Sequence, residues 1–289
     1  MDKTLLSILA GLGGMVGWGT SDFFANISSD KVGHLKTFFW SQLAGIVLTL
    51  ILIPIFGFYS NITFIFGFFV ILASLFYSAG YLLFYKAFEI GNVSIVAASI
   101  NLYVILSMII AAIFSKQTLT TSQGIAITLV LTGVTLVSIN FEDLRSKKIK
   151  LFAGIKEVLF ASLFFGIFWG MSEHISEKIG WLPTTLYIKF VAIISIFIFA
   201  MISKKPLKLS KTESKAWYFI MLVGLLEAGA VASVNFGLEF GDLILVSPIS
   251  SALSVVTISM AVIFLKEKLS KIQVVGIVTT LVGIILTTI

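Results

Sequence analysis

The feature that most constrains this chain is a run of about 20 mostly apolar residues that recurs ten times, with short polar breaks between the runs. A helix of about 20 apolar residues spans the hydrocarbon core of a bilayer. Charged residues make up only 12% of the 289 residues, about half the share that a soluble domain carries. The sequence therefore predicts an all-α membrane protein. The ten predicted transmembrane helices cover residues 4–25, 35–57, 65–88, 93–115, 121–140, 152–174, 183–203, 216–238, 243–264 and 270–289.

The second half of the chain repeats the first. A shift of 150 residues places Lys116 on Lys266, and a shift of 151 places Trp18 on Trp169. Each half then holds five spans, and an odd number of spans forces the two halves into opposite orientations. Many secondary transporters follow this inverted plan, with the site near the membrane midplane between the halves. The predicted units are a first five-helix repeat, a charged connecting loop and an inverted second five-helix repeat, over residues 1–141, 142–151 and 152–289.

The distribution of lysine and arginine among the loops predicts the orientation. The side that holds the loops after the odd-numbered spans carries 15 of these residues, counted with the adjoining span ends, and the side that holds both termini carries 3. By the positive-inside rule, the sequence predicts a multi-pass protein of the cell membrane with both termini outside. The net charge of +6 arises from these loops, so it indicates topology and contact with anionic membrane lipids rather than nucleic-acid binding.

Several kinds of chemistry lack their sequence signatures. The chain has no cysteine, and its two histidines, His34 and His174, are far apart, so no thiolate metal site is expected. Neither a Gly-x-Ser-x-Gly elbow nor a His-Glu-x-x-His motif nor a Walker loop occurs, and these are the motifs of common hydrolases, zinc proteases and nucleotidases. We therefore predict that the chain is not an enzyme, has no cofactor or metal, and does not itself hydrolyse ATP.

One diffuse motif occurs twice in the same order. Its first copy reads Ala87-Phe88-Glu89-Ile90-Gly91 and, one span later, Lys116-Gln117-Thr118-Leu119. In the second copy Pro248 opens span nine, and Lys266-Glu267-Lys268-Leu269 follows that span. Together these copies resemble the drug/metabolite transporter superfamily, with the EamA type as the nearest match. The resemblance implies a ten-helix bundle of two inverted five-helix repeats that moves small molecules by alternating access. The sequence departs from the family pattern at Gln117, where a glutamate is expected, and in span four, where the expected proline is absent.

Three carboxylates inside the predicted spans are the strongest candidates for chemistry. An ionisable group in the bilayer costs about 2.5–3.5 kcal/mol and therefore faces a cavity or a partner. Glu227 lies near the middle of span eight beside small residues that are expected to leave space around it. We predict that it binds a substrate amine or a proton, the alternative being a structural hydrogen bond. Asp22 and Glu173 occupy equivalent positions after Trp-Gly pairs. They are predicted to gate the two mouths of the cavity or attract cations there, the alternative being solvated span ends.

Other charged residues are expected to have structural roles. Lys189 in span seven is predicted to snorkel towards the surface or to pair with a carboxylate such as Glu173. Glu239, which precedes a turn, is predicted to cap or pair at that turn, as is its repeat mate Glu89.

Glycines and polar residues inside the spans complete the set. Gly13 and Gly17 have the spacing of a close helix contact or of a hinge, and we predict the helix contact. Polar and aromatic side chains in spans one, three, four, six, eight and nine either line a cavity and bind a ligand or hold helices together. These residues are Trp18, Trp169, Tyr77, Tyr81, Asn101, Tyr103, Asn235, Ser247 and Ser250.

These features together predict a secondary transporter for a small metabolite, namely an amino acid, an amine or a related compound. A proton or an exchanged solute is the candidate coupling partner, and the protein is expected to be a monomer or a homodimer. The only arginine, Arg145, lies in a loop, which disfavours phosphorylated substrates because these need a basic clamp. The alternative is a passive channel-like or lipid-handling protein, or an accessory membrane subunit.

Overall fold

A computed structural model describes residues 2–90, 99–138, 154–210, 213, 216–266 and 269–287. Within these ranges the chain is helical and contains no strand. The predicted connecting loop 142–151 and the side chain of Glu89 lie outside the described residues. The helices are α1 (Lys3–Val32), α2 (His34–Phe56), α3 (Phe64–Ile90), α5 (Leu102–Phe114), α6 (Thr121–Ser138), α8 (Ile155–Ile179), α9 (Trp181–Ile202), α10 (Trp217–Phe240), α11 (Leu243–Ser250), α12 (Leu253–Leu265) and α13 (Lys271–Leu286).

The described helices match the predicted spans closely. Eight segments are long and apolar enough to cross a membrane when α11 and α12 are taken as one broken helix, and α5 and α13 are shorter apolar helices. Large apolar side chains such as Ile51, Phe64 and Phe197 are exposed on the outside of the bundle, where lipid tails would solvate them. The prediction of an all-α, multi-pass membrane protein is confirmed.

Sharp turns recur at equivalent points of the two halves. Gly33, at a φ of 81°, joins α1 to α2, and Gly180, at a φ of 91°, joins α8 to α9. Lys116 follows α5 at a φ of 53°, and Lys266 follows α12 at a φ of 56°. Because a residue other than glycine rarely adopts positive φ, the recurrence of a left-handed lysine 150 residues later is consistent with a duplicated fold.

The fourth helix of each half is interrupted. In the second half, Pro248 has no N–H and its ring crowds the carbonyl of Ile244, and the helix ends at Ser250 and resumes at Leu253. In the first half, a turn at Asn101 precedes the start of α5. Broken helices inside a membrane are tolerated where they are buried in protein or line a cavity, so both interruptions point to the middle of the bundle.

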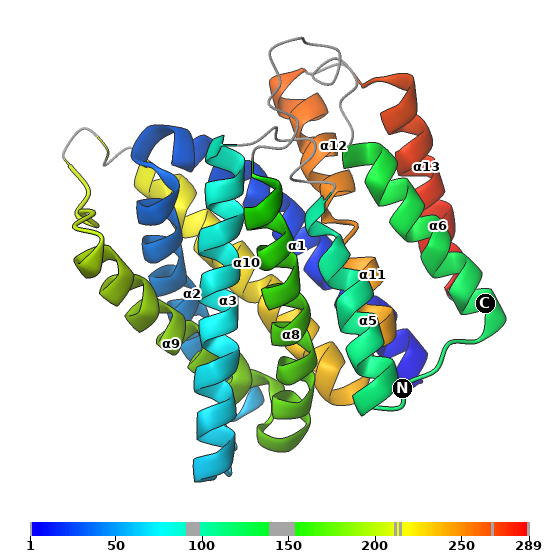
Figure 1. The fold of residues 1–289 in the computed structure, drawn as a ribbon, viewed down its shortest axis with the longest axis horizontal. Helices are drawn as coiled ribbons and strands as arrows, with labels where there is room; N and C mark the ends of the chain where they lie inside the picture. Colours follow the sequence, from blue (N-terminus) through cyan, green and yellow to red (C-terminus); the bar gives the residue numbers. More distant parts are fainter. Residues whose placement is uncertain are drawn as a thin grey trace.

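The helices of the two halves interlock instead of forming two separate bundles (Figure 1). Helix α1 packs on α10, α11 and α12, α2 packs on α9 and α10, α3 packs on α8 and α9, and α6 packs on α13. One end of the bundle, here called the termini end, holds the start of α1, the α2–α3 and α8–α9 turns and the end of α13. The other end, here called the lysine-rich end, holds Lys31, Lys36, Lys204, Lys266 and Lys271.

Small residues let α1 and α10 approach closely. A Cβ atom added at Gly17 would lie 2.8 Å from Ala230 Cβ and 3.0 Å from the carbonyl oxygen of Leu226. Gly13 likewise faces Ser233 of α10. The predicted packing role of Gly13 and Gly17 is confirmed, and this contact fixes the face of α1 that points into the bundle.

Candidate functional site

Glu227 of α10 and Lys189 of α9 form a buried ion pair. The Lys189 side chain is fully buried, and that of Glu227 is 7% exposed. Glu227 Oε1 also accepts a hydrogen bond of 2.6 Å from the Tyr77 hydroxyl, and Oε2 accepts one of 3.2 Å from Gln42 Nε2. Gln42 Oε1 in turn accepts a hydrogen bond of 3.2 Å from Lys189 Nζ. This cluster, here called the buried tetrad, links α2, α3, α9 and α10.

The buried tetrad confirms one expectation in part and corrects another. Lys189 pairs with a carboxylate, as predicted, but the partner is Glu227 and not Glu173, because α9 packs beside α10 and directs this side chain inward. The small neighbours of Glu227 do not leave space around it. Ala228 is 1% exposed, and a Cβ atom added at Gly45 of α2 would lie 3.1 Å from its Cβ. The small residues therefore allow close helix packing, which dehydrates the pair and makes its hydrogen bonds essential.

Glu173 of α8 is held by neutral donors near the termini end. Its Oε2 accepts a hydrogen bond of 2.5 Å from Ser115 Oγ, and its Oε1 accepts bonds from Gln117 Nε2 at 2.7 Å and from the Leu243 backbone N–H at 3.2 Å. Gln117 Oε1 accepts a bond of 3.0 Å from the backbone N–H of Ile244. Glu173 is only 1% exposed, so it is not a solvated carboxylate at the end of a span. Glu173 and Gln117 together cap the first N–H groups of α11.

Asp22 has a different environment from its repeat mate. It is exposed, although it lies one turn after buried Trp18 and shares the interior face of α1 with it. It interacts electrostatically with Glu227 of α10, which packs directly on α1, and with Tyr103 of α5. Among the described residues, none donates a hydrogen bond to Asp22 or forms an ion pair with it. Asp22 is thus a water-accessible carboxylate on an inward-facing helix surface.

Aromatic rings form a continuous cluster between the halves. The Trp18 and Trp169 ring centroids lie 5.4 Å apart, and Trp169 continues to Phe168 at 4.6 Å. Tyr77 lies 4.9 Å from Phe168 and 4.8 Å from Tyr81. Four of the predicted residues are therefore brought together. The sequence interpretation missed Phe168 because it weighed only aromatic residues with a polar atom.

The predicted polar residues fall into two groups. Ser247 of α11 forms a hydrogen bond of 2.8 Å with Ser107 of α5, and Tyr103 is hydrogen-bonded to Ser250, so these contacts cross between the halves. Asn235 is fully buried, and its hydrogen bonds to other described residues lie within the second half: its Oδ1 accepts a bond of 2.8 Å from Ser172 Oγ, and its Nδ2 donates one of 2.9 Å to Thr185 Oγ1.

Asn101 is half-buried at the turn before α5. Glu239 Oε2 accepts a bond of 2.6 Å from the Trp181 N–H, so Glu239 caps the start of α9 rather than the turn that follows Glu239 itself. Gln42 was missed, and the signal that could have found it is a lone amide within an apolar span.

A model of the EamA-like transporter family matches residues 5–139 and again residues 152–289. The chain belongs to the EamA-like transporter family. It is therefore a multi-pass membrane transporter of the drug/metabolite transporter superfamily, which confirms the resemblance noted in the sequence. A solved structure named "Crystal structure of protein" has the same fold, with a TM-score of 0.78 and 13% sequence identity over 98% of this chain and 98% of that chain. No curated protein matches the sequence.

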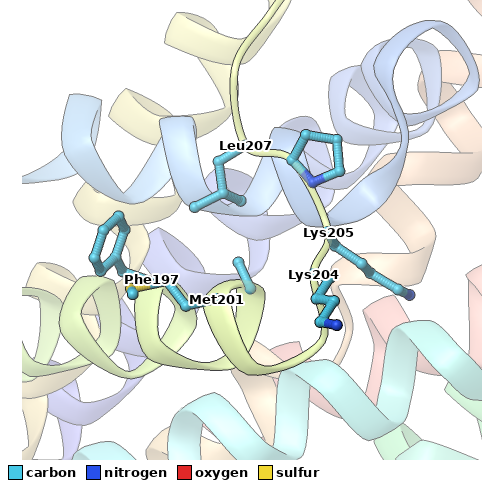
Figure 2. A pocket seen from close by; sticks show the side chains of 7 residues that line it. Phe197, Met201, Lys204, Lys205 and Leu207 are labelled. Atoms are coloured by element: carbon cyan, nitrogen blue, oxygen red, sulfur yellow. The ribbon is translucent and has the colours of Figure 1, made fainter.

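Two grooves on this EamA-like transporter lie away from the candidate site. The groove in Figure 2 has a volume of about 320 Å³ and lies at the lysine-rich end of α9, between Phe197, Met201, Lys204 and Leu207. Apolar side chains beside lysines are typical of a helix end at the membrane interface. A second groove, of about 410 Å³, runs between α5 and α6 and is lined by apolar side chains. None of the predicted site residues lines either groove.

Proposed function

We propose that this chain is a secondary transporter that moves a small metabolite carrying a protonated amine, by alternating access between two inverted five-helix halves. The first half comprises residues 1–141 and the second comprises 152–289, with 142–151 as their connection. Membership of a family of membrane transporters supports the general function, and the arrangement of charges supports the substrate class.

The observation that carries this proposal is the state of Asp22. Of the three carboxylates singled out in the sequence, Glu227 is neutralised by Lys189 and Glu173 is buried among hydrogen-bond donors. Asp22 is exposed and has no such partner among the described residues. A carboxylate within a membrane-spanning helix favours an opposite charge, so a substrate ammonium group is its natural partner. Nearby aromatic rings favour the same charge through cation–π attraction.

The surrounding residues support a binding role for the middle of the bundle. Trp18 lies one turn from Asp22 and contacts Trp169, while Tyr103 and Ser250 join the two interrupted helices. In this proposal these residues line the substrate site with Tyr81, Asn101 and Ser247, and Tyr77 and Asn235 fix the positions of α3 and α10. Glu227 interacts electrostatically with Asp22, so a substrate bound at Asp22 changes the electrostatic environment of Glu227. Glu227 is therefore the candidate proton-coupling group.

The inverted arrangement is supported by the direction of the helices. Helix α1 begins at the termini end, whereas α8, the first described helix of the second half, begins at the lysine-rich end (Figure 1). Two halves of opposite direction can exchange conformations, so that an inward-facing and an outward-facing state have the same contacts in swapped positions. The lysine bias supports an orientation with both termini outside.

The deciding experiment is flux in proteoliposomes with radiolabelled amines and amino acids, with and without a proton gradient. A carrier shows saturable uptake and counterflow, in which unlabelled substrate inside accelerates the entry of label. Asp22→Asn should abolish counterflow of the amine because it removes the charge. Asp2→Asn, the same chemical change at the exposed chain end, should transport normally.

Three outcomes contradict the proposal. Flux that rises linearly with concentration and shows no counterflow for any candidate solute would support the channel-like alternative. Normal amine transport by Asp22→Asn would exclude Asp22 as the ammonium partner. Transport of anionic solutes in preference to amines would exclude the proposed substrate class.

A further inference from the structure

We infer that Glu173, Gln117 and Ser115 form a latch that holds the termini end closed in the conformation seen here. The inference rests on the proposed alternating access and adds the residues that set the balance between its two states. These three residues position helices and do not contact the substrate in this proposal.

The latch joins the halves at one point. Ser115 and Gln117 follow α5 in the first half, and Glu173 lies in α8 of the second half. Their three side chains meet at the start of α11, where the N–H groups of Leu243 and Ile244 donate to Glu173 and Gln117 at 3.2 Å and 3.0 Å. Separation of the halves at this end must break these bonds together.

Neighbouring contacts converge on the same segment. Asp242 forms an ion pair of 2.7 Å with Lys3, and its backbone N–H donates to Ser7 Oγ at 2.8 Å. The start of α11 is therefore tied to α1 as well as to α8 and to the segment after α5. The negative carboxylate of Glu173 also interacts favourably with the positive N-terminal end of α11.

Asp22, the repeat mate of Glu173, differs from it in exposure to solvent. Asp22 lies at the equivalent position of the first half, nearer the lysine-rich end, and it is exposed, whereas Glu173 is 1% exposed. Two equivalent carboxylates thus have unequal environments within one conformation. This inequality is what an inverted pair of halves produces when one end is closed and the other is open. Loss of the latch should therefore shift the population towards the state that is open at the termini end.

Cysteine labelling tests this inference without any substrate, and the natural chain has no cysteine. Ser247→Cys places a thiol one turn inside the latch on α11, and Ala25→Cys places one nearly a turn beyond Asp22 on α1. A membrane-impermeant maleimide is applied to sealed vesicles of each orientation. Adding Glu173→Gln should raise the labelling rate at position 247 from the termini end about tenfold, and lower the rate at position 25 from the lysine-rich end by a similar factor. Loss of one hydrogen bond to a charged group shifts a conformational equilibrium by about this factor.

Matched variants separate a latch from a general loss of structure. Glu157→Gln makes the same change near the other end of α8, where Glu157 pairs with Lys86 at the surface, and it should leave both rates unchanged. The exchange variant Glu173→Gln with Gln117→Glu restores one carboxylate and one amide at the contact, and it should return both rates towards those of the natural chain.

Each outcome decides between the alternatives. Opposite changes at the two positions, reversed by the exchange variant, support the latch. An increase at both positions shows a loosened fold and overturns it, and so do unchanged rates. If labelling responds as described while no solute shows counterflow, the latch stands and the proposed transport function fails.

Discussion

At the scale of single residues, charged side chains within the membrane-spanning helices differ in whether another residue neutralises them. Lys189 and Glu227 are buried and share four hydrogen-bonding or ionic contacts within the buried tetrad. Breaking a buried pair by removing one partner is costly, whereas replacing both partners with apolar residues is often neutral. The pair therefore contributes to the stability of the fold through mutual compensation, while the side chain of Asp22 stays exposed.

The first prediction concerns this pair. Lys189→Met and Glu227→Leu should each lower the free energy of unfolding by about 3–5 kcal/mol, because each leaves one buried charge uncompensated. The double variant should recover most of this loss. Thermal unfolding of the four proteins in detergent measures the effect. Additive losses in the double variant would show that the two charges do not depend on each other.

The second prediction concerns pH at the surface. Lys36 Nζ and Glu213 Oε1 lie 2.8 Å apart, and the hydrogen bonds from Lys36 and Ser210 lower the pKa of Glu213 from 4.5 to about 2. Because the folded-state pKa is lowered, the pair stabilises the fold above pH 4.5 and loses this effect as the pH falls towards 2. Glu213→Gln should lower the midpoint of thermal unfolding slightly at neutral pH, and the difference should vanish near pH 2. An unchanged difference across this range would contradict the assignment.

At the scale of helices, close packing between helices of opposite halves depends on glycine. Helices α6 and α13 pack on each other along Gly133, Gly276 and Gly283. A Cβ atom added at Gly276 would lie 2.7 Å from the backbone nitrogen of Val137. Backbone atoms cannot move aside as side chains do, so only glycine allows the helices to approach this closely.

The third prediction follows from this contact. A Cβ atom at Gly283 would lie 2.7 Å from the nitrogen of Val130 and 2.8 Å from the carbonyl oxygen of Ala126. Gly283→Ala should therefore destabilise the protein by about 1–3 kcal/mol through overpacking. Gly67→Ala in α3 is the control, since its nearest neighbouring atom, in Ile62, lies 4.0 Å away. That variant should be neutral or slightly stabilising in the same thermal unfolding experiment.

At the scale of the whole molecule, the two ends of the bundle differ in charge and in closure. Lysines lie at the ends of α1, α9 and α12 and at the starts of α2 and α13, and the latch lies at the opposite end. If both termini lie outside, as the charge bias predicts, the conformation seen here is closed towards the outside. The charge bias and the latch together thus link orientation to conformational state.

The fourth prediction tests that orientation. Tyr59, in the α2–α3 turn, is 79% exposed at the termini end, and Lys204 is exposed at the lysine-rich end. An impermeant maleimide added to intact cells should label the Tyr59→Cys variant and leave Lys204→Cys unlabelled until the membrane is permeabilised. The reverse pattern would place both termini in the cytoplasm and would reverse the direction in which the latch faces.

The sequence by itself determined the helices, because a helix that spans a lipid bilayer requires a long apolar run. Such a run consists of consecutive residues, so it can be recognised without knowledge of the packing. It also determined the duplication, since Lys116 and Lys266 or Trp18 and Trp169 repeat along the chain whatever the packing. Only the tertiary structure decided which charges are neutralised. Lys189 and Glu227 are 38 residues apart and Gln42 lies 147 residues from Lys189, so their contact depends on how α2, α9 and α10 pack. The same packing buries Glu173 and leaves Asp22 exposed. In the proposed inverted arrangement, these equivalent positions face different ends of the bundle, which accounts for the difference.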